Sequence, residues 1–171
     1  RLKLDHFNIH VEKFNSDSGN VNFNISELSF TDKSGFKLLD MDTEVFIHQE
    51  EGGLQNMVIR TPYSYINADS IILNHGGYEH FDDFISQVKL NVAVKRSNLG
   101  FHDLAYFAKS FHGMPDQNFV FSGEVNGTIN SLRGKDIYAA MGNHTEIKTN
   151  FNTDGLPKLS DTYLYVDIDR F

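Results

Sequence analysis

The side chains that could do chemistry are scattered along this 171-residue chain. Of its eight histidines, His6 and His10 would share one face of a strand. At that spacing about 13 Å separates their Cα atoms, which is too far for one metal ion. We therefore expect histidines that are exposed or locally hydrogen-bonded, and no metal site.

Two pairs of carboxylates have the spacing that places both members on one face of a strand. They are Asp40 with Asp42, and Asp167 with Asp169. Catalytic carboxylate pairs exist at such separations, but a solvated outer face of a sheet explains these pairs more simply. We assign no catalytic role to either pair.

Motifs for nucleophilic catalysis and phosphate binding are absent from the sequence. No serine lies in a G-x-S-x-G elbow, and Gly123 and Gly127 lie within an expected strand rather than at a strand-to-helix turn. The absence of cysteine excludes disulfides and thiol catalysis. We predict that the protein is not an enzyme and needs no cofactor.

The composition is that of an ordinary globular protein, with 40% hydrophobic and 22% charged residues. A formal net charge of −8 without a basic cluster argues against a nucleic-acid partner. There is no signal peptide and no apolar run of membrane-spanning length. Because the chain starts at Arg1 without methionine and stops at Phe171 directly after an expected strand, we expect residues 1–171 to be one undivided segment of a longer protein.

Strict alternation of apolar and polar residues dominates the chain and predicts strands with one apolar and one polar face. It is clearest in residues 116–152, and it recurs upstream in Val88, Leu90, Val92 and Val94. The alternation changes parity near Asp5 and again before Leu28, which predicts β-bulges. The segment Asp32-Lys33-Ser34-Gly35 is typical of a tight hairpin turn. In total we expect nine or ten strands, one of them over Asp83–Ser97.

One segment has helical rather than alternating spacing. Its apolar residues fall at 104, 107, 108 and 111, and Asp103 stands where its charge suits the first turn of a helix. We expect a short helix over residues 103–111, with Leu104, Phe107 and Phe111 capping an edge of the sheet.

Several phrases occur in an order that resembles a known family. They are Leu28–Phe36, Leu54–Ser64, Asn98–Phe107, and Phe121–Ile129 followed by the Gly155-Leu156-Pro157 turn. This order resembles the AsmA-like superfamily and, within it, TamB-like translocation and assembly module proteins, over about residues 20–169.

The resemblance implies an all-β fold: a long, curved, mostly antiparallel sheet that forms a continuous apolar groove, called a β-taco. It implies a periplasmic segment of a Gram-negative envelope protein that is anchored in the inner membrane when full-length. It further implies transport of phospholipid between the inner and outer membranes, with acyl chains as the ligand and an outer-membrane barrel protein as a partner.

On this interpretation ten apolar residues are the candidate lining of the lipid groove: Val88, Leu90, Val92, Val94, Phe119, Phe121, Val125, Ile129, Ile147 and Phe151. Three alternatives stay open. The apolar faces could instead form the closed core of a β-sandwich. The protein could be a scaffold for outer-membrane protein assembly that pairs its edge strands with client strands. Finally, a sandwich-type adhesin could bind glycans through Tyr63, Tyr65, Tyr163 and Tyr165.

Overall fold

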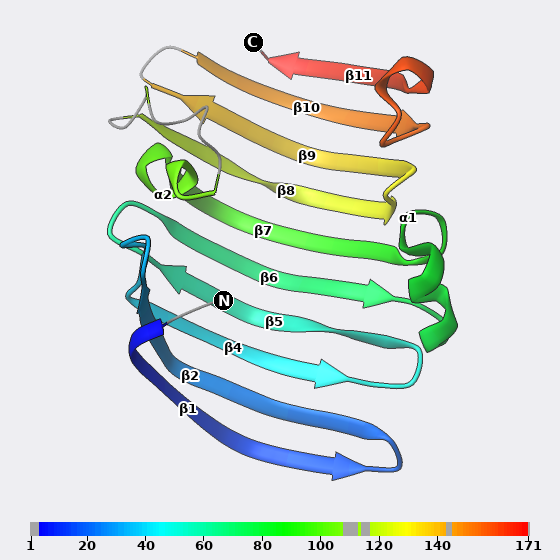
Figure 1. Cartoon of the computed structure of the whole chain (residues 1–171). Coiled ribbons are helices and arrows are strands. Elements are labelled where there is room, and N and C mark those ends of the chain that lie inside the picture. The colour runs from blue at the N-terminus through cyan, green and yellow to red at the C-terminus, as the bar shows by residue number, and fades with distance from the viewer. Residues whose placement is uncertain (1–3, 108–112, 114–116, 143–144, 171) are drawn as a thin grey trace.

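The computed structural model describes residues 4–107, 113, 117–142 and 145–170. Within these residues the chain forms one sheet of eleven strands (Figure 1). The strands are β1 (Leu4–Asp17), β2 (Asn20–Asp32), β3 (Lys37–Leu38), β4 (Asp40–Ile47), β5 (Glu51–Arg60), β6 (Tyr65–Asn74), β7 (Lys89–Gly100), β8 (Asn118–Thr128), β9 (Ser131–Met141), β10 (Thr145–Asp154) and β11 (Tyr163–Arg170).

The strands of this sheet pair antiparallel, and along the main path each strand pairs with its neighbours in sequence. The exception is the two-residue β3, which pairs beside β4 on the end of β2. The predicted all-β, antiparallel and curved sheet is therefore confirmed. The predicted Asp32–Gly35 turn is also present, because the Gly35 N–H donates to the Asp32 carbonyl at 3.1 Å.

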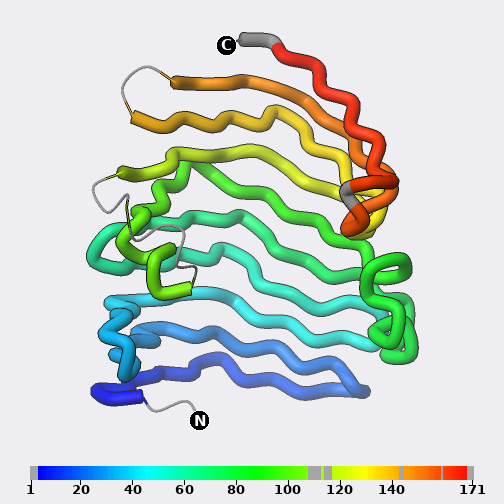
Figure 2. Tube along the Cα trace, turned by 45° about the horizontal axis from the view of Figure 1, so that its top comes forward, coloured from blue at the N-terminus to red at the C-terminus, as the bar shows by residue number. Residues whose placement is uncertain are grey.

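The sheet is bent into a trough because β-bulges lie at the same level in several strands. Glu27, Asn56 and Asp136 adopt left-handed backbone angles, with φ of 58°, 51° and 52°. The strand register shifts beside these residues, and also between Ala68 and Ser70 of β6. A bulge bends its strand, so a row of bulges folds the sheet along a line that crosses the strands (Figure 2).

Polar side chains on neighbouring strands hold two of these bulges. The Glu27 N–H donates to Asp42 Oδ1 at 3.3 Å, and the Asp136 N–H donates to Asn150 Oδ1 at 2.8 Å. The predicted parity changes have the same origin, since β1 shifts register after Asp5 and Glu27 is the bulge before Leu28.

Helical segments lie at the two ends of the strands (Figures 1 and 2). The alternation predicts a strand from Asp83, but β7 begins at Lys89. The preceding residues form the 3-10 helix η1 (Tyr78–Asp83) and the helix α1 (Phe84–Gln87). This expectation was wrong because Phe84, Ile85 and Val88 have the spacing of one helix face, and that short pattern can be mistaken for a strand. A short 3-10 helix, η3 (Leu159–Asp161), precedes β11.

At the opposite end, α2 (Phe101–Ala105) begins two residues before the predicted helix and is shorter. Residues 108–112 lie outside the described part of the chain, so the expected role of Phe111 does too. The helix does not cap an edge strand; it follows directly from β7, in the middle of the sheet. The ring of Phe107, just beyond α2, lies 5.3 Å from that of Phe36 in the β2–β3 turn.

A buried carboxylate fixes α2 to the β5–β6 turn. Asp103 is 4% exposed, and its Oδ2 accepts hydrogen bonds from the hydroxyls of Thr61 and Ser64. The Ser64 hydroxyl also accepts the Gly100 N–H at 3.0 Å. Within the described residues, no helix has both the length and the apolar character that crossing a bilayer requires.

Candidate functional site

The concave face of the sheet carries an uninterrupted apolar row that crosses nine strands. Each member is the direct cross-strand partner of the next. From β2 to β11 the row consists of Phe23, Val45, Leu54, Ile71, Val92, Val125, Gly134, Phe151 and Val166. Phe14 extends it onto β1, with its ring 6.3 Å from that of Phe23. Facing partners in an antiparallel pair bring their Cβ atoms to about 5 Å, so the row is a continuous apolar path.

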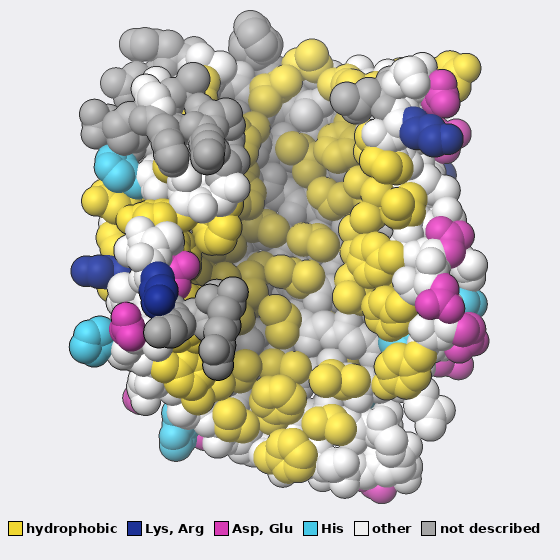
Figure 3. Space-filling view, viewed as in Figure 1, with side chains coloured by type: hydrophobic (Ala, Val, Ile, Leu, Met, Phe, Trp, Pro, Cys, Tyr) yellow, Lys and Arg dark blue, Asp and Glu magenta, His cyan; other side chains and the backbone are white. Residues whose placement is uncertain are grey.

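Two further rows on the same face widen this path into a groove. One of them is separated from the first row by the line of bulges. It contains Met57, Ala68, Val94 and Gly123, with Ile137, Thr149 and Ile168 on the strands that follow. The row on the other side contains Val21, Ile47, Gly52, Leu73, Leu90, Gly127 and Leu132. We call the three rows together the apolar groove. In the space-filling view hydrophobic side chains follow the hollowed face from one end of the molecule to the other (Figure 3).

The apolar groove is open to solvent rather than covered by a second layer. Among the described residues only six hydrophobic side chains are buried: Leu38, Phe46, Met57, Ala68, Val88 and Phe101. Val92, Val125 and Phe151 at the centre of the groove are only partly buried. A second sheet packed about 10 Å away would bury such side chains completely. The strands of the described residues all belong to one sheet, so a closed sandwich core is not what these residues form.

Most of the candidate lining residues lie on β7, β8 and β10 and are in the groove. Eight are in strands with side chains on the concave face: Leu90, Val92 and Val94 in β7, Phe119, Phe121 and Val125 in β8, and Ile147 and Phe151 in β10. The structure makes Val92 and Val125 direct partners, and it stacks the rings of Phe119 and Phe121 at 5.7 Å.

The remaining two candidates lie outside the strands. Val88 precedes β7 at the end of α1 and is completely buried, so it belongs to the small core under that helix. Ile129 lies in the two-residue turn between β8 and β9, where the Asn130 N–H donates to the Ile85 carbonyl at 3.2 Å.

The N-terminal half of the groove is not evident from the sequence. Phe23, Val45, Leu54 and Ile71 contribute to the central row, yet none is among the candidate lining residues. The bulge at Asn56 separates Leu54 from Met57 by three residues while keeping both on one face. The alternation of apolar and polar residues is therefore interrupted in the sequence. Only the changes of parity indicate bulges after which the same apolar face continues.

The outer face is mainly polar, in contrast to the groove, although Phe46 and Ile72 also lie on it. One row of direct partners on this face contains Glu12, Asn24, Glu44, Gln55, Ser70, Ala93, Glu124 and Lys135. Asp40 of the first carboxylate pair accepts a hydrogen bond from Arg60 Nη1 at 2.8 Å, so it is engaged in a structural ion pair.

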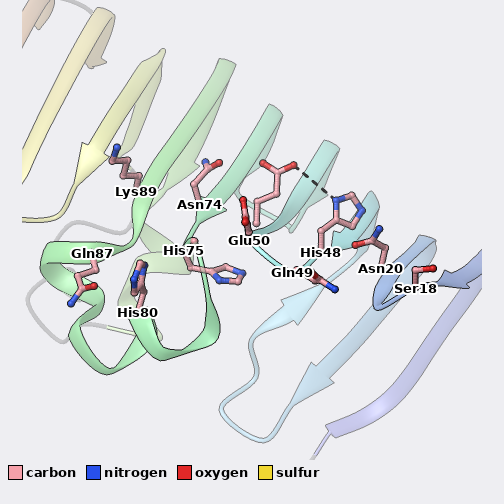
Figure 4. A pocket seen from close by; sticks show the side chains of 12 residues that line it. Ser18, Asn20, His48, Gln49, Glu50, Asn74, His75, His80, Gln87 and Lys89 are labelled. Atoms are coloured by element: carbon pink, nitrogen blue, oxygen red, sulfur yellow. Dashed lines mark ion pairs between the residues drawn. The ribbon is translucent and has the colours of Figure 1, made fainter.

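A polar depression of about 680 Å³ lies at the ends of β4, β5 and β6, beside η1 (Figure 4). His48 Nε2 contacts Asn22 Oδ1 at 3.1 Å, and His48 Nδ1 lies 4.0 Å from a Glu51 carboxylate oxygen. His75 is 3% exposed and its Nδ1 accepts the Gly77 N–H at 3.2 Å. In the part of the chain that the structure describes, no group of three or more histidine, aspartate or glutamate side chains could hold a metal ion.

Comparisons with protein-family models, with curated proteins and with solved structures found no match to this chain.

Proposed function

We propose that this chain is a segment of an AsmA/TamB-like envelope protein, and that its apolar groove carries the acyl chains of phospholipids between the inner and outer membranes. In this role the segment lies in the periplasm of a Gram-negative bacterium, and the full-length protein is anchored in the inner membrane. The observation that carries the proposal is the apolar row from Phe23 to Val166, which crosses nine strands without a charged side chain and stays open to solvent.

The energetics of lipid transfer explain why such a row is useful. Exposing one methylene group to water costs about 0.8 kcal/mol, so two acyl chains of about fifteen carbons cost roughly 24 kcal/mol. An apolar surface offsets that cost at each position along the path. Burial of apolar area is non-directional, so an acyl chain can slide from one strand to the next without breaking specific bonds.

The mainly polar outer face and the lack of a catalytic constellation among the described residues fit the same role. Transport along a surface requires no reacting group, because the headgroup stays in water at the open side of the trough while the acyl chains lie in it. The groove has an open side and an apolar floor, which is the minimum that this process needs.

Photo-crosslinking at adjacent residues tests the proposal, because neighbours in a strand point to opposite faces. A photoreactive amino acid at Val92 or Phe121 faces the groove, and one at Asn91 or Ser122 faces outward. We expect phospholipid adducts, detected by mass spectrometry after irradiation in cells, at Val92 and Phe121 only. Equal capture at both faces, or no capture at Val92 and Phe121, contradicts the proposal.

A second candidate function is a scaffold for outer-membrane protein assembly, and the edge strand β11 favours it. Leu164, Val166 and Ile168 are 63%, 40% and 51% exposed on this strand, and its outer edge has no partner among the described residues. An unpaired apolar edge can accept another strand by β-augmentation. Crosslinks from β11 to barrel proteins, together with a lack of lipid adducts in the groove, would support this function over lipid transfer.

A further inference from the structure

The outer face carries a second uninterrupted row of direct partners, immediately beside the central row of the groove but on the opposite side of the sheet. It crosses ten strands, from Asn15 on β1 to Tyr165 on β11. Its members are Asn15, Asn22, Phe46, Gly53, Ile72, Asn91, Asn126, Arg133, Asn152 and Tyr165. The half over β7–β11 is polar throughout, and with Tyr163 it forms what we call the outer track: Asn91, Asn126, Arg133, Asn152, Tyr163 and Tyr165.

The outer track is hollowed along its length. A depression of about 440 Å³ is lined by Asn91, Asn126 and Arg133, and the next one, of about 360 Å³, by Arg133, Asn152 and the two tyrosines. Arg133 and Ser131 line both depressions, so the two adjoin.

The polar side chains of the outer track are free to bind a ligand. Among the described residues, the side chains of Asn91, Asn126, Arg133 and Asn152 make no hydrogen bond and no ion pair. Each asparagine amide offers two donor hydrogens and an acceptor oxygen. Neighbouring strands place these groups about 4.8 Å apart, which is close to the length that one pyranose unit adds to an extended sugar chain.

Two aromatic rings stand at the end of the outer track. Tyr163 and Tyr165 are 80% and 65% exposed and, two residues apart, they lie on the same face of β11. The other two tyrosines considered as stacking platforms are engaged elsewhere: Tyr63 stacks on His102 at 4.2 Å, and Tyr65 lies under the Arg60 guanidinium at 5.6 Å.

We propose that the outer track binds a linear oligosaccharide of β-linked pyranose units, which lies across β7–β11. The tyrosine rings stack on the apolar faces of the sugar rings, and the asparagine amides and Arg133 pair with hydroxyl or acetamido groups. A polyanion is a poor fit because the chain carries a net charge of −8 and this surface also contains Asp154. The proposal goes beyond lipid transfer and uses the opposite face of the sheet.

Isothermal titration of the 171-residue chain with cellohexaose and with chitohexaose tests the proposal. We expect saturable binding of at least one of the two hexasaccharides. The double variant Tyr163→Ala/Tyr165→Ala should weaken it roughly tenfold or more, since two stacking contacts are lost. Asn126→Leu should weaken it as well, because it removes the amide without shortening the side chain.

Two controls separate the outer track from other surfaces and from folding. Tyr63→Ala removes a tyrosine at the other end of the strands and should leave the affinity unchanged. Val92→Asp alters the groove and should also leave sugar affinity unchanged, so a failure of lipid transfer does not affect this result. Circular dichroism spectra and melting temperatures should match those of the unaltered chain for the two tyrosine substitutions, whose side chains are largely exposed. The proposal is overturned if neither hexasaccharide binds at millimolar concentration, or if binding is equal in the outer-track and control variants.

Discussion

Asp32 organises the turn between β2 and β3, where its carboxylate accepts three hydrogen bonds. The Ser34 hydroxyl, the Ser34 N–H and the Phe36 N–H donate to Oδ1 at 2.5, 2.8 and 3.2 Å. These bonds favour the charged form, the Ser34 hydroxyl most strongly, and they hold the pKa of Asp32 below its ordinary value despite some opposing desolvation.

The first prediction concerns the pH dependence of this turn. A carboxyl whose pKa is lower in the folded state stabilises the fold fully above its ordinary pKa, and this contribution is lost as the pH falls through the folded-state pKa. A carbon-13 NMR titration should therefore give Asp32 a lower pKa in the folded chain than in an unfolded reference peptide. The Ser34→Ala substitution should raise the pKa of Asp32 in the folded chain. An unchanged pKa in Ser34→Ala would contradict this assignment.

The second prediction concerns the buried carboxylate that fixes α2. Asp103→Ala removes the acceptor of the Thr61 and Ser64 hydroxyls, and it should lower the free energy of unfolding by roughly 3 kcal/mol. Asp103→Asn keeps an acceptor oxygen and should lose less. Urea denaturation measures both, with the exposed Asp82→Ala as a control that should remain near the unaltered value. A loss in Asp103→Ala no larger than in Asp82→Ala would contradict the anchoring role.

The β-bulges bend the antiparallel sheet into a trough, and they depend on left-handed backbone angles. Asp136, with φ of 52°, lies next to Lys135 in β9. A β-branched residue tolerates such an angle poorly, whereas glycine adopts it readily.

The third prediction rests on that difference. Asp136→Val should destabilise the fold by about 1–2 kcal/mol more than Asp136→Gly in chemical denaturation, because both variants lose the carboxylate but only valine is strained. Lys135→Val, at an exposed neighbour outside the left-handed region, should change the stability little. If Asp136→Val and Asp136→Gly prove equally stable, the bulge is not held by this backbone angle.

The β-bulges also determine how much of the fold and of the groove could be predicted from the sequence. In β7, β8 and β10 the alternation is regular enough to assign eight candidate residues to one face of their strands, and the structure places them on the concave face. The N-terminal half of the central row could not be predicted because Glu27 and Asn56 each add an extra residue and shift the parity of the residues after them. The helix α1 resembles a strand in the sequence because its four residues are too few to show a helical period. Of the outer track, the sequence indicates only Tyr163 and Tyr165, because the position of the other members depends on which residues become partners across strands.

At the scale of the whole molecule, the two edges of the sheet differ. β1 carries left-handed residues at His6 and Lys13 and several register shifts, which make its edge irregular. β11 pairs with β10 in continuous register from Tyr163 to Ile168, and its apolar side chains are exposed. A regular, apolar edge strand is a site for association with other strands.

The fourth prediction is that β11 controls self-association. Val166→Lys places a charge on the apolar face of the edge strand and should shift concentrated protein towards the monomer, as measured by size-exclusion chromatography with light scattering. Asp167→Lys adds a lysine to the same strand on the outer face and should have a smaller effect. If the two variants shift the protein towards the monomer equally, association depends on net charge rather than on the apolar edge strand β11.

The pairing of each long strand with its sequence neighbours has a consequence for how such a molecule can evolve. Each added hairpin would lengthen both the apolar inner face and the outer face by two strands. The strand pairs elsewhere in the sheet would stay as they are, because each long strand pairs only with its neighbours in sequence. Duplicating or deleting a hairpin would therefore alter only the length of the sheet across its strands, while the apolar inner face and the outer face kept the same character.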